Sequence, residues 1–311
     1  MFKIPVEIDR LHPVRRSKKQ KQAFRDDVVQ YVTNLGYDCT VEKGRIGAQN
    51  IVIGDPEKAR YLITAHYDTT AGIGVPDFIT PSNFLFFVVY QILFVALFFL
   101  IAFLASYVVR FLTDDQMLIF WSAYIAYFGA LLLLMFGPAN RHNSNDNTSG
   151  VVTVLEIARS LPENLRGKVC FVLFDLAEVG MLGSSSYRKT HKEATDSQIV
   201  LNLDCVGDGD EIVFFPTTKL LKNEIAIVRL SKVYGKLGAK SIAQRKRGFA
   251  YYPSDQVNFP LGVGICALRR NKWIGLYMNR IHTCRDTILE ETNVNILRAA
   301  LITLISSDAA K

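Results

Sequence analysis

Residues 168–175 read K-V-C-F-V-L-F-D and form a nearly continuous apolar run, which is typical of a strand buried on both faces of a sheet. A helical pattern precedes this run at residues 150–161, and another begins after it at residues 183–190. Strands that alternate with helices favour an α/β fold. We therefore predict a central sheet, mostly parallel, with helices on both faces.

The pattern continues outward in both directions. Residues from about Ser17 to Leu35 predict an amphipathic helix that is closed by Gly36. Further strands are predicted at residues 38–42, 50–53, 61–65, 199–204 and 264–268, and further helices at 222–237 and 293–306. In sheets of this kind the ligand site forms beyond the carboxyl ends of the strands, so polar residues just after these strands are of most interest.

Two apolar runs interrupt this pattern. Half of the 311 residues are hydrophobic and the mean hydropathy is +0.17, and the excess lies in residues 84–109 and 117–136, which contain no Asp, Glu, Lys or Arg. As helices they would extend about 39 Å and about 30 Å, enough to cross a bilayer core of roughly 30 Å. Buried core helices are disfavoured because such helices keep a polar stripe. We expect a transmembrane hairpin at residues 84–136, inserted into one discontinuous domain of residues 1–83 and 137–311.

The orientation of this hairpin is predicted from the N-terminal region. Basic residues beside the spans are balanced, with Arg110 in the connecting loop and Arg141 after the second span. No apolar stretch follows Met1, and basic residues including those of the cluster Arg15–Lys21 precede the first span, which opposes translocation of this region. We expect an integral membrane protein with two transmembrane helices, whose larger domain and both termini are cytoplasmic.

The composition limits the classes of binding partner and the cellular compartment that we expect for this chain. The five cysteines show no C-x-x-C spacing, so neither a disulfide framework nor a thiolate zinc site is indicated, and reduced thiols agree with a cytoplasmic domain. The cluster Arg15–Lys21 fits contact with anionic headgroups or a solvated helix start, and both remain open. Nucleic acid is disfavoured despite the net charge of +7, because no aromatic platform accompanies the basic residues.

Polar side chains follow the predicted strands or lie in the loops beside them. His66 and Asp68 follow the strand at 61–65, where strand alternation places both on one side. Imidazole nitrogens and carboxylate oxygens without thiolates suit zinc in a hydrolytic site, and two zinc ions about 3.5–4 Å apart need a shared carboxylate. Each residue alone also fits a structural role, such as a helix cap or a turn, but joint placement at one sheet edge favours a metal site. The other candidates are Asp146, Glu178, Asp204 and His282.

Six motifs in these places resemble those of a family of zinc-dependent exopeptidases, which includes bacterial leucyl-type aminopeptidases, glutamate carboxypeptidases and glutaminyl cyclases. The resemblance covers nearly all of the chain outside the hairpin and keeps the family's order. The hairpin falls where the family has a variable connection. The matching motifs are A-H-Y-D-T at 65–69, D-N-T-S-G at 146–150, E-V-G-M-L-G-S at 178–184, N-L-D-C-V-G at 202–207, S-D-Q at 254–256 and I-H-T-C-R-D-T at 281–287.

The resemblance implies a role for each matching residue. Asp146 would bridge two zinc ions, His66 and Asp204 would complete one site, and Glu178 and His282 would complete the other. Two further carboxylates are implied outside the ligand set. Asp68 would fix the tautomer of His66, and Asp286 is given only a supporting role.

One position departs from the family's pattern. The family usually has two consecutive glutamates where this chain has Ala177 and Glu178, and the first of them is the general base. Loss of such a group typically costs about 10²–10⁴-fold in rate, so we expect this chain to be impaired. Three explanations compete: an engineered substitution, which the intact ligand set favours, a natural pseudoenzyme, or replacement of the base by Asp175.

The leading interpretation is therefore a membrane-anchored di-zinc metallopeptidase, most closely an aminopeptidase. Its expected partners are the lipid bilayer and peptide substrates, including hydrophobic or membrane-derived ones, although the hairpin could equally be a simple anchor. A non-catalytic peptide-binding scaffold and a glutaminyl cyclase-like enzyme remain as alternatives. A transporter is disfavoured because the spans contain no ionisable residue that could mark a pathway. The oligomeric state and the substrate stay open.

Overall fold

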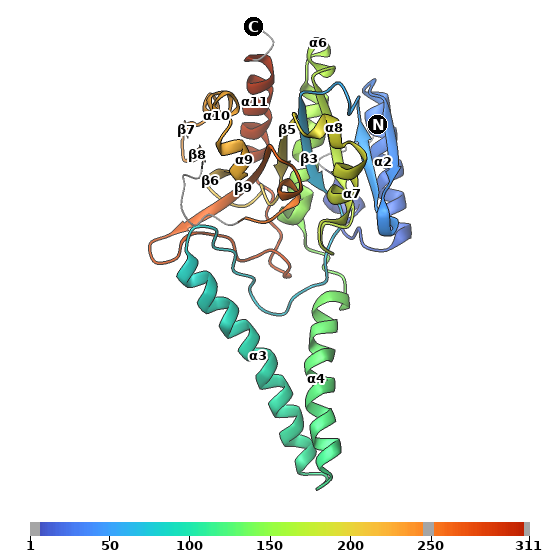
Figure 1. Ribbon diagram of the computed structural model, residues 1–311, viewed down its shortest axis with the longest axis vertical. Coiled ribbons are helices and arrows are strands. Elements are labelled where there is room, and N and C mark those ends of the chain that lie inside the picture. The colour runs from blue at the N-terminus through green and yellow to red at the C-terminus, as the bar shows by residue number, and fades with distance from the viewer. Residues whose placement is uncertain (1–6, 245–251, 308–311) are drawn as a thin grey trace.

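The computed structural model describes residues 7–244 and 252–307, and they form a body of sheet and helices from which two long helices project (Figure 1). The sheet has ten strands. Nine follow the order β1-β2-β4-β3-β5-β9-β6-β8-β7, and β10 pairs with β9. The strands are β1 Cys39–Lys43, β2 Gln49–Ile53, β3 Tyr61–His66, β4 Val169–Phe174, β5 Ile199–Leu203, β6 Glu211–Pro216, β7 Gly235–Leu237, β8 Lys240–Gln244, β9 Gly262–Asn271 and β10 Gly275–Tyr277.

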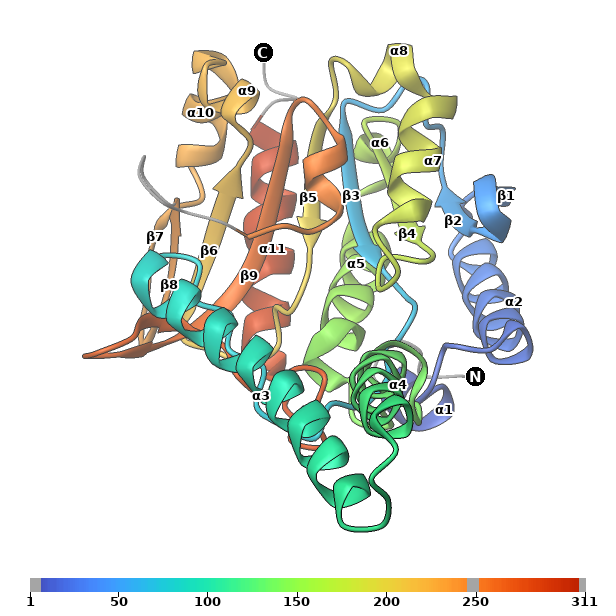
Figure 2. The ribbon, with the colours of Figure 1, turned by 60° about the horizontal axis from the view of Figure 1, so that its bottom comes forward.

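The centre of the sheet is parallel, as the sequence predicts. β4, β3, β5 and β9 run in one direction, and antiparallel pairs β2–β4 and β6–β9 flank them on either side. All six residues of β3 and all six of β4 are buried, which explains why these strands are continuously apolar rather than alternating. The carboxyl ends of the central strands face the side of the body from which the long helices leave (Figure 2).

Helices cover both faces of the sheet. They are α1 Ile8–Leu11, α2 Lys18–Asn34, α5 Gly150–Ser160, α6 Glu163–Arg166, α7 Leu182–Thr190, α8 Lys192–Thr195, α9 Thr218–Leu221, α10 Glu224–Ser231 and α11 Glu291–Ser307, with short turns η1 Arg45–Gly47, η2 Ser144–Ser149 and η3 Asp255–Asn258. Alternate strand residues divide between two cores. Ile63 of β3 joins the larger core with Phe24 of α2 and Leu297 of α11, whereas Leu62 joins a smaller one with Tyr187 of α7.

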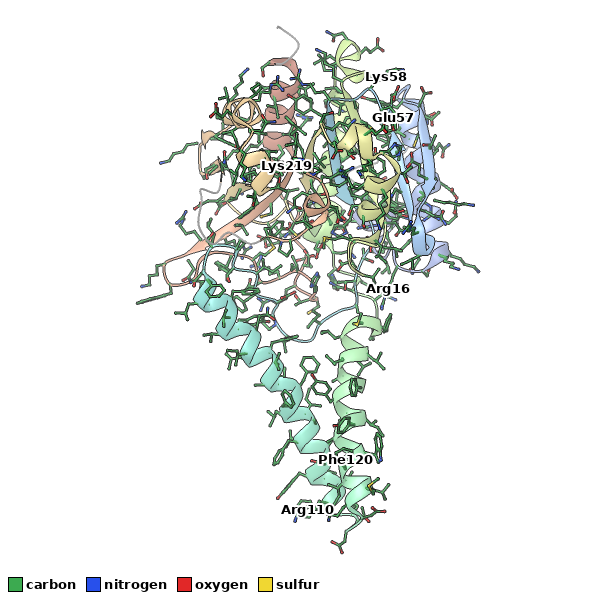
Figure 3. The ribbon with its side chains drawn as sticks, in the orientation of Figure 1. Arg16, Glu57, Lys58, Arg110, Phe120 and Lys219 are labelled. Atoms are coloured by element: carbon green, nitrogen blue, oxygen red, sulfur yellow. The ribbon has the colours of Figure 1, made fainter. Side chains whose placement is uncertain are left out.

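The two projecting helices are α3 Phe84–Arg110 and α4 Gln116–Phe136, and they contact each other along a hairpin whose far end carries Arg110 and Phe120 (Figure 3). Asn83 caps α3 by accepting from the backbone of Phe86, and Asp115 caps α4. Both helices are long and apolar enough to cross a membrane, and α4 has no buried residue. Large apolar side chains therefore lie exposed along both helices.

The chain enters and leaves this hairpin at neighbouring points. Ala71 and Ala139 form an antiparallel bridge, Gly72 donates to the carbonyl of Pro138 at 2.9 Å, and Asn140 donates to the carbonyl of Thr70 at 3.1 Å. The excursion from the body therefore begins and ends on one short paired segment.

Most of the predicted elements agree with the structure to within two residues, but three expectations were wrong or incomplete. The predicted helix at 222–237 is the shorter α10 followed by strand β7, and the sequence pattern did not reveal β6, β8 or β10. The N-terminal basic cluster is exposed only in part, because Lys18 and Lys19 are exposed, whereas Arg15 is fully buried and Lys21 forms a buried ion pair with Asp175 at 2.6 Å. Headgroup contact by Arg15 and Lys21 is therefore excluded.

Candidate metal centre

The structure brings all five predicted metal ligands to one edge of the sheet. His66 is the last residue of β3, Asp204 follows β5 directly, and Glu178 lies in the loop after β4. Asp146 lies in turn η2 before α5, and His282 lies in the loop after β10. All five line one cavity of about 200 Å³. Residues far apart in the sequence therefore converge because parallel strands end at the same edge.

Two groups of side chains can each hold a cation, and they share one residue. In the first group, Nε2 of His66 lies 3.3 Å from Oδ1 of Asp146 and 3.6 Å from Oδ1 of Asp204. In the second group, Nε2 of His282 lies 2.8 Å from Oδ2 of Asp146 and 3.8 Å from Oε2 of Glu178. The ligand atoms within each group lie within 4.8 Å of one another. Asp146 therefore presents one carboxylate oxygen to each group, as a bridging ligand would.

The residues present fit a pair of zinc ions. Two imidazoles and three carboxylates, without thiolates, are a donor set of the co-catalytic type. Oε1 of Glu178 is buried and has no hydrogen-bond partner among residues 7–244 and 252–307. A buried carboxylate oxygen without a partner is costly, and a bound cation would satisfy it.

The buried carboxylates and imidazoles of the two groups shift one another's pKa values. Burial opposes ionisation of Asp146, but His282 and His66 outweigh it and hold the pKa of Asp146 well below its ordinary value. Burial and the neighbouring charge of Asp146 raise the pKa of Glu178 to about 8. Two carboxylates this close cannot both ionise cheaply unless a cation lies between them. A metal ion would supply that charge.

Asp68 lies where the resemblance predicts. Its carboxylate is 3.5 Å from Nδ1 of His66, which also lies 3.2 Å from the backbone oxygen of Asp68. The same carboxylate accepts the backbone N–H groups of Ala177 at 3.0 Å and Glu178 at 3.2 Å. One buried side chain thus holds both an imidazole of the first group and the loop that carries Glu178 of the second.

Asp286 supports the centre in a similar way. Its two oxygens accept the backbone N–H groups of Asn145 at 2.8 Å and Asp146 at 3.0 Å. Burial and the charge of Asp146 raise the pKa of Asp286 to about 8. Asp286 therefore fixes the turn that presents Asp146, which agrees with the supporting role expected for it.

Asp175 cannot replace the missing base, so this explanation for Ala177 is wrong. Ala177 lines the cavity, but Asp175 does not. One oxygen of Asp175 accepts from Lys21 at 2.6 Å and from the backbone of Leu176 at 2.9 Å, and the other accepts from the backbone of Gln49 at 3.1 Å. Asp175 is a buried structural anchor.

Two functional neighbours of the centre were not assigned from the sequence. Ser254, within the quoted S-D-Q motif, donates to Oδ2 of Asp204 at 2.5 Å. Arg15 donates to the carbonyls of Tyr67 and His12 and to the hydroxyl of Thr148, which ties the end of β3 to turn η2. Burial lowers the pKa of Arg15 to about 10. A basic cluster gives no sign of such a buried contact, so the sequence pattern could not have found it.

Comparison with known proteins agrees with this geometry. In fold, the chain resembles the LapA aminopeptidase of Legionella pneumophila, at 15% identity and TM-score 0.56 over 96% of this chain and 67% of that one. It equally resembles the glutaminyl cyclase of Tannerella forsythia, at 17% identity and TM-score 0.56 over 96% of this chain and 95% of that one.

In sequence, a stretch of 67 residues is 42% identical to the aminopeptidase YwaD of Bacillus subtilis, and it spans 21% of this chain and 15% of that relative. Residues 137–304 match peptidase family M28, and this range contains four of the five candidate ligands. Because the match covers more than half of the chain, the chain belongs to peptidase family M28.

Proposed function

We propose that this protein is a membrane-anchored di-zinc peptidase of the aminopeptidase type. Its rate of peptide hydrolysis is low because Ala177 occupies the position of the general base. The observation that carries the proposal is the position of Asp146, which offers one oxygen to His66 and the other to His282. A single mononuclear site would need no such shared carboxylate.

Each residue has a defined task in this proposal. His66 and Asp204 would hold one zinc ion, Glu178 and His282 the other, and Asp146 both. When bound, the two ions would lower the pKa of a water molecule and polarise the scissile carbonyl. The backbone oxygen and the carboxylate of Asp68 lie 3.2 Å and 3.5 Å from Nδ1 of His66. This contact on the Nδ1 side keeps Nε2 directed into the cavity. A methyl group at Ala177 cannot take up a proton.

Other described residues of the cavity do not supply the missing base. Tyr252 donates to the backbone oxygen of Asp204, and Ser254 donates to its carboxylate. The thiol of Cys205 contacts the same carboxylate at 3.1 Å. Proton transfer to the leaving amine is therefore expected to be slow, with losses of about 10²–10⁴-fold.

Metal content and activity together test the proposal. The purified full chain should bind about two zinc ions, and the Ala177→Glu variant should hydrolyse unblocked peptides in preference to N-acetylated ones. Absence of bound zinc, or absence of hydrolysis by the zinc-loaded Ala177→Glu variant, would overturn it.

The position of the hairpin affects which peptides can reach the active site. We propose residues 84–136 as a transmembrane hairpin within a discontinuous peptidase domain, residues 1–83 and 137–311. The active-site end of the sheet then faces the bilayer (Figure 2).

A second cavity, of about 500 Å³, lies where the chain enters and leaves the hairpin, between Gly72–Pro76, Pro138–His142 and Thr283–Arg285. Hydrophobic or membrane-derived peptides could approach by this route. In the Ala177→Glu variant, a peptide with a free N-terminus and a fatty-acyl chain on a side chain near its C-terminus should be cleaved faster than its water-soluble equivalent in nanodiscs, but not in detergent.

Glutaminyl cyclisation is the second candidate, because the Tannerella forsythia glutaminyl cyclase shares the fold over nearly its whole length. A zinc content near one per chain would count against the di-zinc peptidase and favour this activity. A non-catalytic peptide-binding scaffold is favoured by Ala177 and opposed by the complete ligand set.

A further inference from the structure

The connection between β3 and α3 does more than link the body to the hairpin. Its residues 72–83, here called the lead-in segment, contact the loop that carries His282. Ile73 donates its backbone N–H to the carbonyl of His282 at 2.6 Å, and Ile79 exchanges two backbone hydrogen bonds of 3.0 Å with Met278. Asn83 donates its side-chain amide to the carbonyl of Ile274 at 3.1 Å. The lead-in segment is therefore fastened at three points between Ile274 and His282, on both sides of strand β10.

His282 needs such support because its backbone is strained. Its φ is +60°, in the left-handed region that residues other than glycine rarely adopt. The imidazole is part-buried, and both of its nitrogens have carboxylate neighbours. Nε2 faces Asp146 and Glu178, whereas Nδ1 lies 2.8 Å from Oδ2 of Asp77, within the lead-in segment.

The same arrangement occurs at the other imidazole of the centre. His66 also directs Nε2 towards Asp146 and has a carboxylate, that of Asp68, beside Nδ1. A histidine binds a metal through one nitrogen, and an acceptor at the other nitrogen fixes the tautomer and the direction of the ring. Asp68 is buried two residues after its histidine, but Asp77 is 26% exposed and belongs to the path into the hairpin.

We propose that Asp77 is a positioning residue that orients His282, so that the lead-in segment of the hairpin organises the second metal group. This inference rests on the proposed di-zinc function and adds a link between the anchor and the centre. Among the described residues, His66 and Asp204 of the first group are held by Asp68 and Ser254, which lie outside the lead-in segment. The two metal groups should therefore respond differently to changes at Asp77.

Zinc binding by the full chain in nanodiscs tests this inference. The variants are Asp77→Ala, which removes the acceptor, and Asp77→Asn, which keeps an oxygen acceptor without the charge. Asp114→Asn is the matched control, because it removes an exposed carboxylate from the far end of the same hairpin. Affinity and stoichiometry are measured by competition with a chromophoric chelator, and the thermal midpoint of the metal-free protein reports folding.

For Asp77→Ala we expect one of the two zinc ions to bind about 10–100-fold more weakly, because loss of a histidine's orienting partner typically has this effect. Asp77→Asn should recover part of the loss, and Asp114→Asn should match the wild type. The metal-free thermal midpoint should be the same in all four proteins. Cobalt substitution should show the change in the absorption bands of one ion only.

Two results would overturn the inference. One is unchanged affinity for both zinc ions in Asp77→Ala, and the other is equal weakening of both. If the wild type itself binds no zinc or only one ion, the proposed di-zinc function fails, and that outcome is distinct from a failure at Asp77.

Discussion

Oδ1 of Asp68 lies 3.0 Å from the backbone nitrogen of Ala177, so the same carboxylate that faces His66 also fixes the backbone at the position of the missing base. The direction in which residue 177 projects its side chain is therefore set by the backbone and does not depend on which side chain is present. This relationship makes the effect of a substitution at Ala177 predictable.

Restoring a glutamate at this position should restore catalysis. We expect Ala177→Glu to increase kcat for peptide hydrolysis by about 10²–10⁴-fold, because a carboxylate would enter the cavity beside the metal ligands. Steady-state kinetics on an unblocked peptide measure this change. Ala177→Gln has nearly the same volume and no basic oxygen, so an equal gain in that variant would contradict a base at this position.

Removal of the bridging carboxylate should affect both metals. We expect Asp146→Asn to lower the zinc content from about two ions per chain to well below one, because each group loses an anionic oxygen. Glu178→Gln should retain about one ion, since His66 and Asp204 are untouched. Elemental analysis after gel filtration makes the comparison. If Asp146→Asn kept one tightly bound ion, Asp146 would belong to one group only.

The buried Arg15 should be essential for stability. Arg15→Met leaves the carbonyls of Tyr67 and His12 without their side-chain donor, and each unsatisfied buried group costs about 1–3 kcal/mol. We expect the free energy of unfolding to fall by about 2–6 kcal/mol in total, as measured by denaturant titration. Among the described residues, the exposed Arg10 pairs with Glu7 alone, at 2.8 Å. Arg10→Met is therefore the control and should change stability by less than about 1 kcal/mol.

A histidine remote from the centre should make stability depend on pH. Partial burial lowers the pKa of His191, but hydrogen bonds to Glu57 at 2.6 Å and Glu42 at 3.0 Å outweigh it and raise the pKa above 6.5. The folded protein therefore binds this proton more tightly than the unfolded chain. Its stabilising effect is complete below about pH 6.5 and disappears as the pH rises through the raised pKa.

The His191→Gln variant isolates this effect. We expect the stability difference between the wild type and the variant to shrink with rising pH when thermal midpoints are measured with saturating zinc. A difference that grew with pH would have the wrong sign. Exposure of Glu57 to solvent keeps the effect modest, and added salt should reduce it.

The proposed orientation of the hairpin can be tested with cysteine labelling. Cys284 is exposed on the active-site side, whereas the other four cysteines are buried or part-buried. In intact cells a membrane-impermeant maleimide should label Thr113→Cys, at the far end of the hairpin, but should reach Cys284 only after lysis. The opposite order would place the peptidase domain outside, and a Cys284→Ser background serves as the control for Thr113→Cys.

The sequence reveals those parts of the fold that depend on local pattern. β4 and α5 were predictable because apolar periodicity determines them. The convergence of the five candidate ligands was predictable because His66, Glu178 and Asp204 lie at or just after the ends of strands and all five lie in recognisable motifs. The edge strand β7 and its neighbour β8 were missed because they are short and largely polar, with all three residues of β7 exposed. The burial of Arg15 and the contact between Asp77 and His282 depend on tertiary packing across 52 and 205 residues, which a local pattern does not encode.

The bridge between Ala71 and Ala139 has a practical meaning for protein engineering. The chain leaves the body at Ala71 and returns to it at Ala139, and these two residues are paired. A short turn placed between them would remove the apolar hairpin and close the body with little loss of chain entropy. Such a cut would also discard Asp77. A truncated protein designed in this way would be easier to purify and would keep its core, but His282 would lack the carboxylate beside its Nδ1 atom. A crystal structure of it would therefore show the second metal group without this contact.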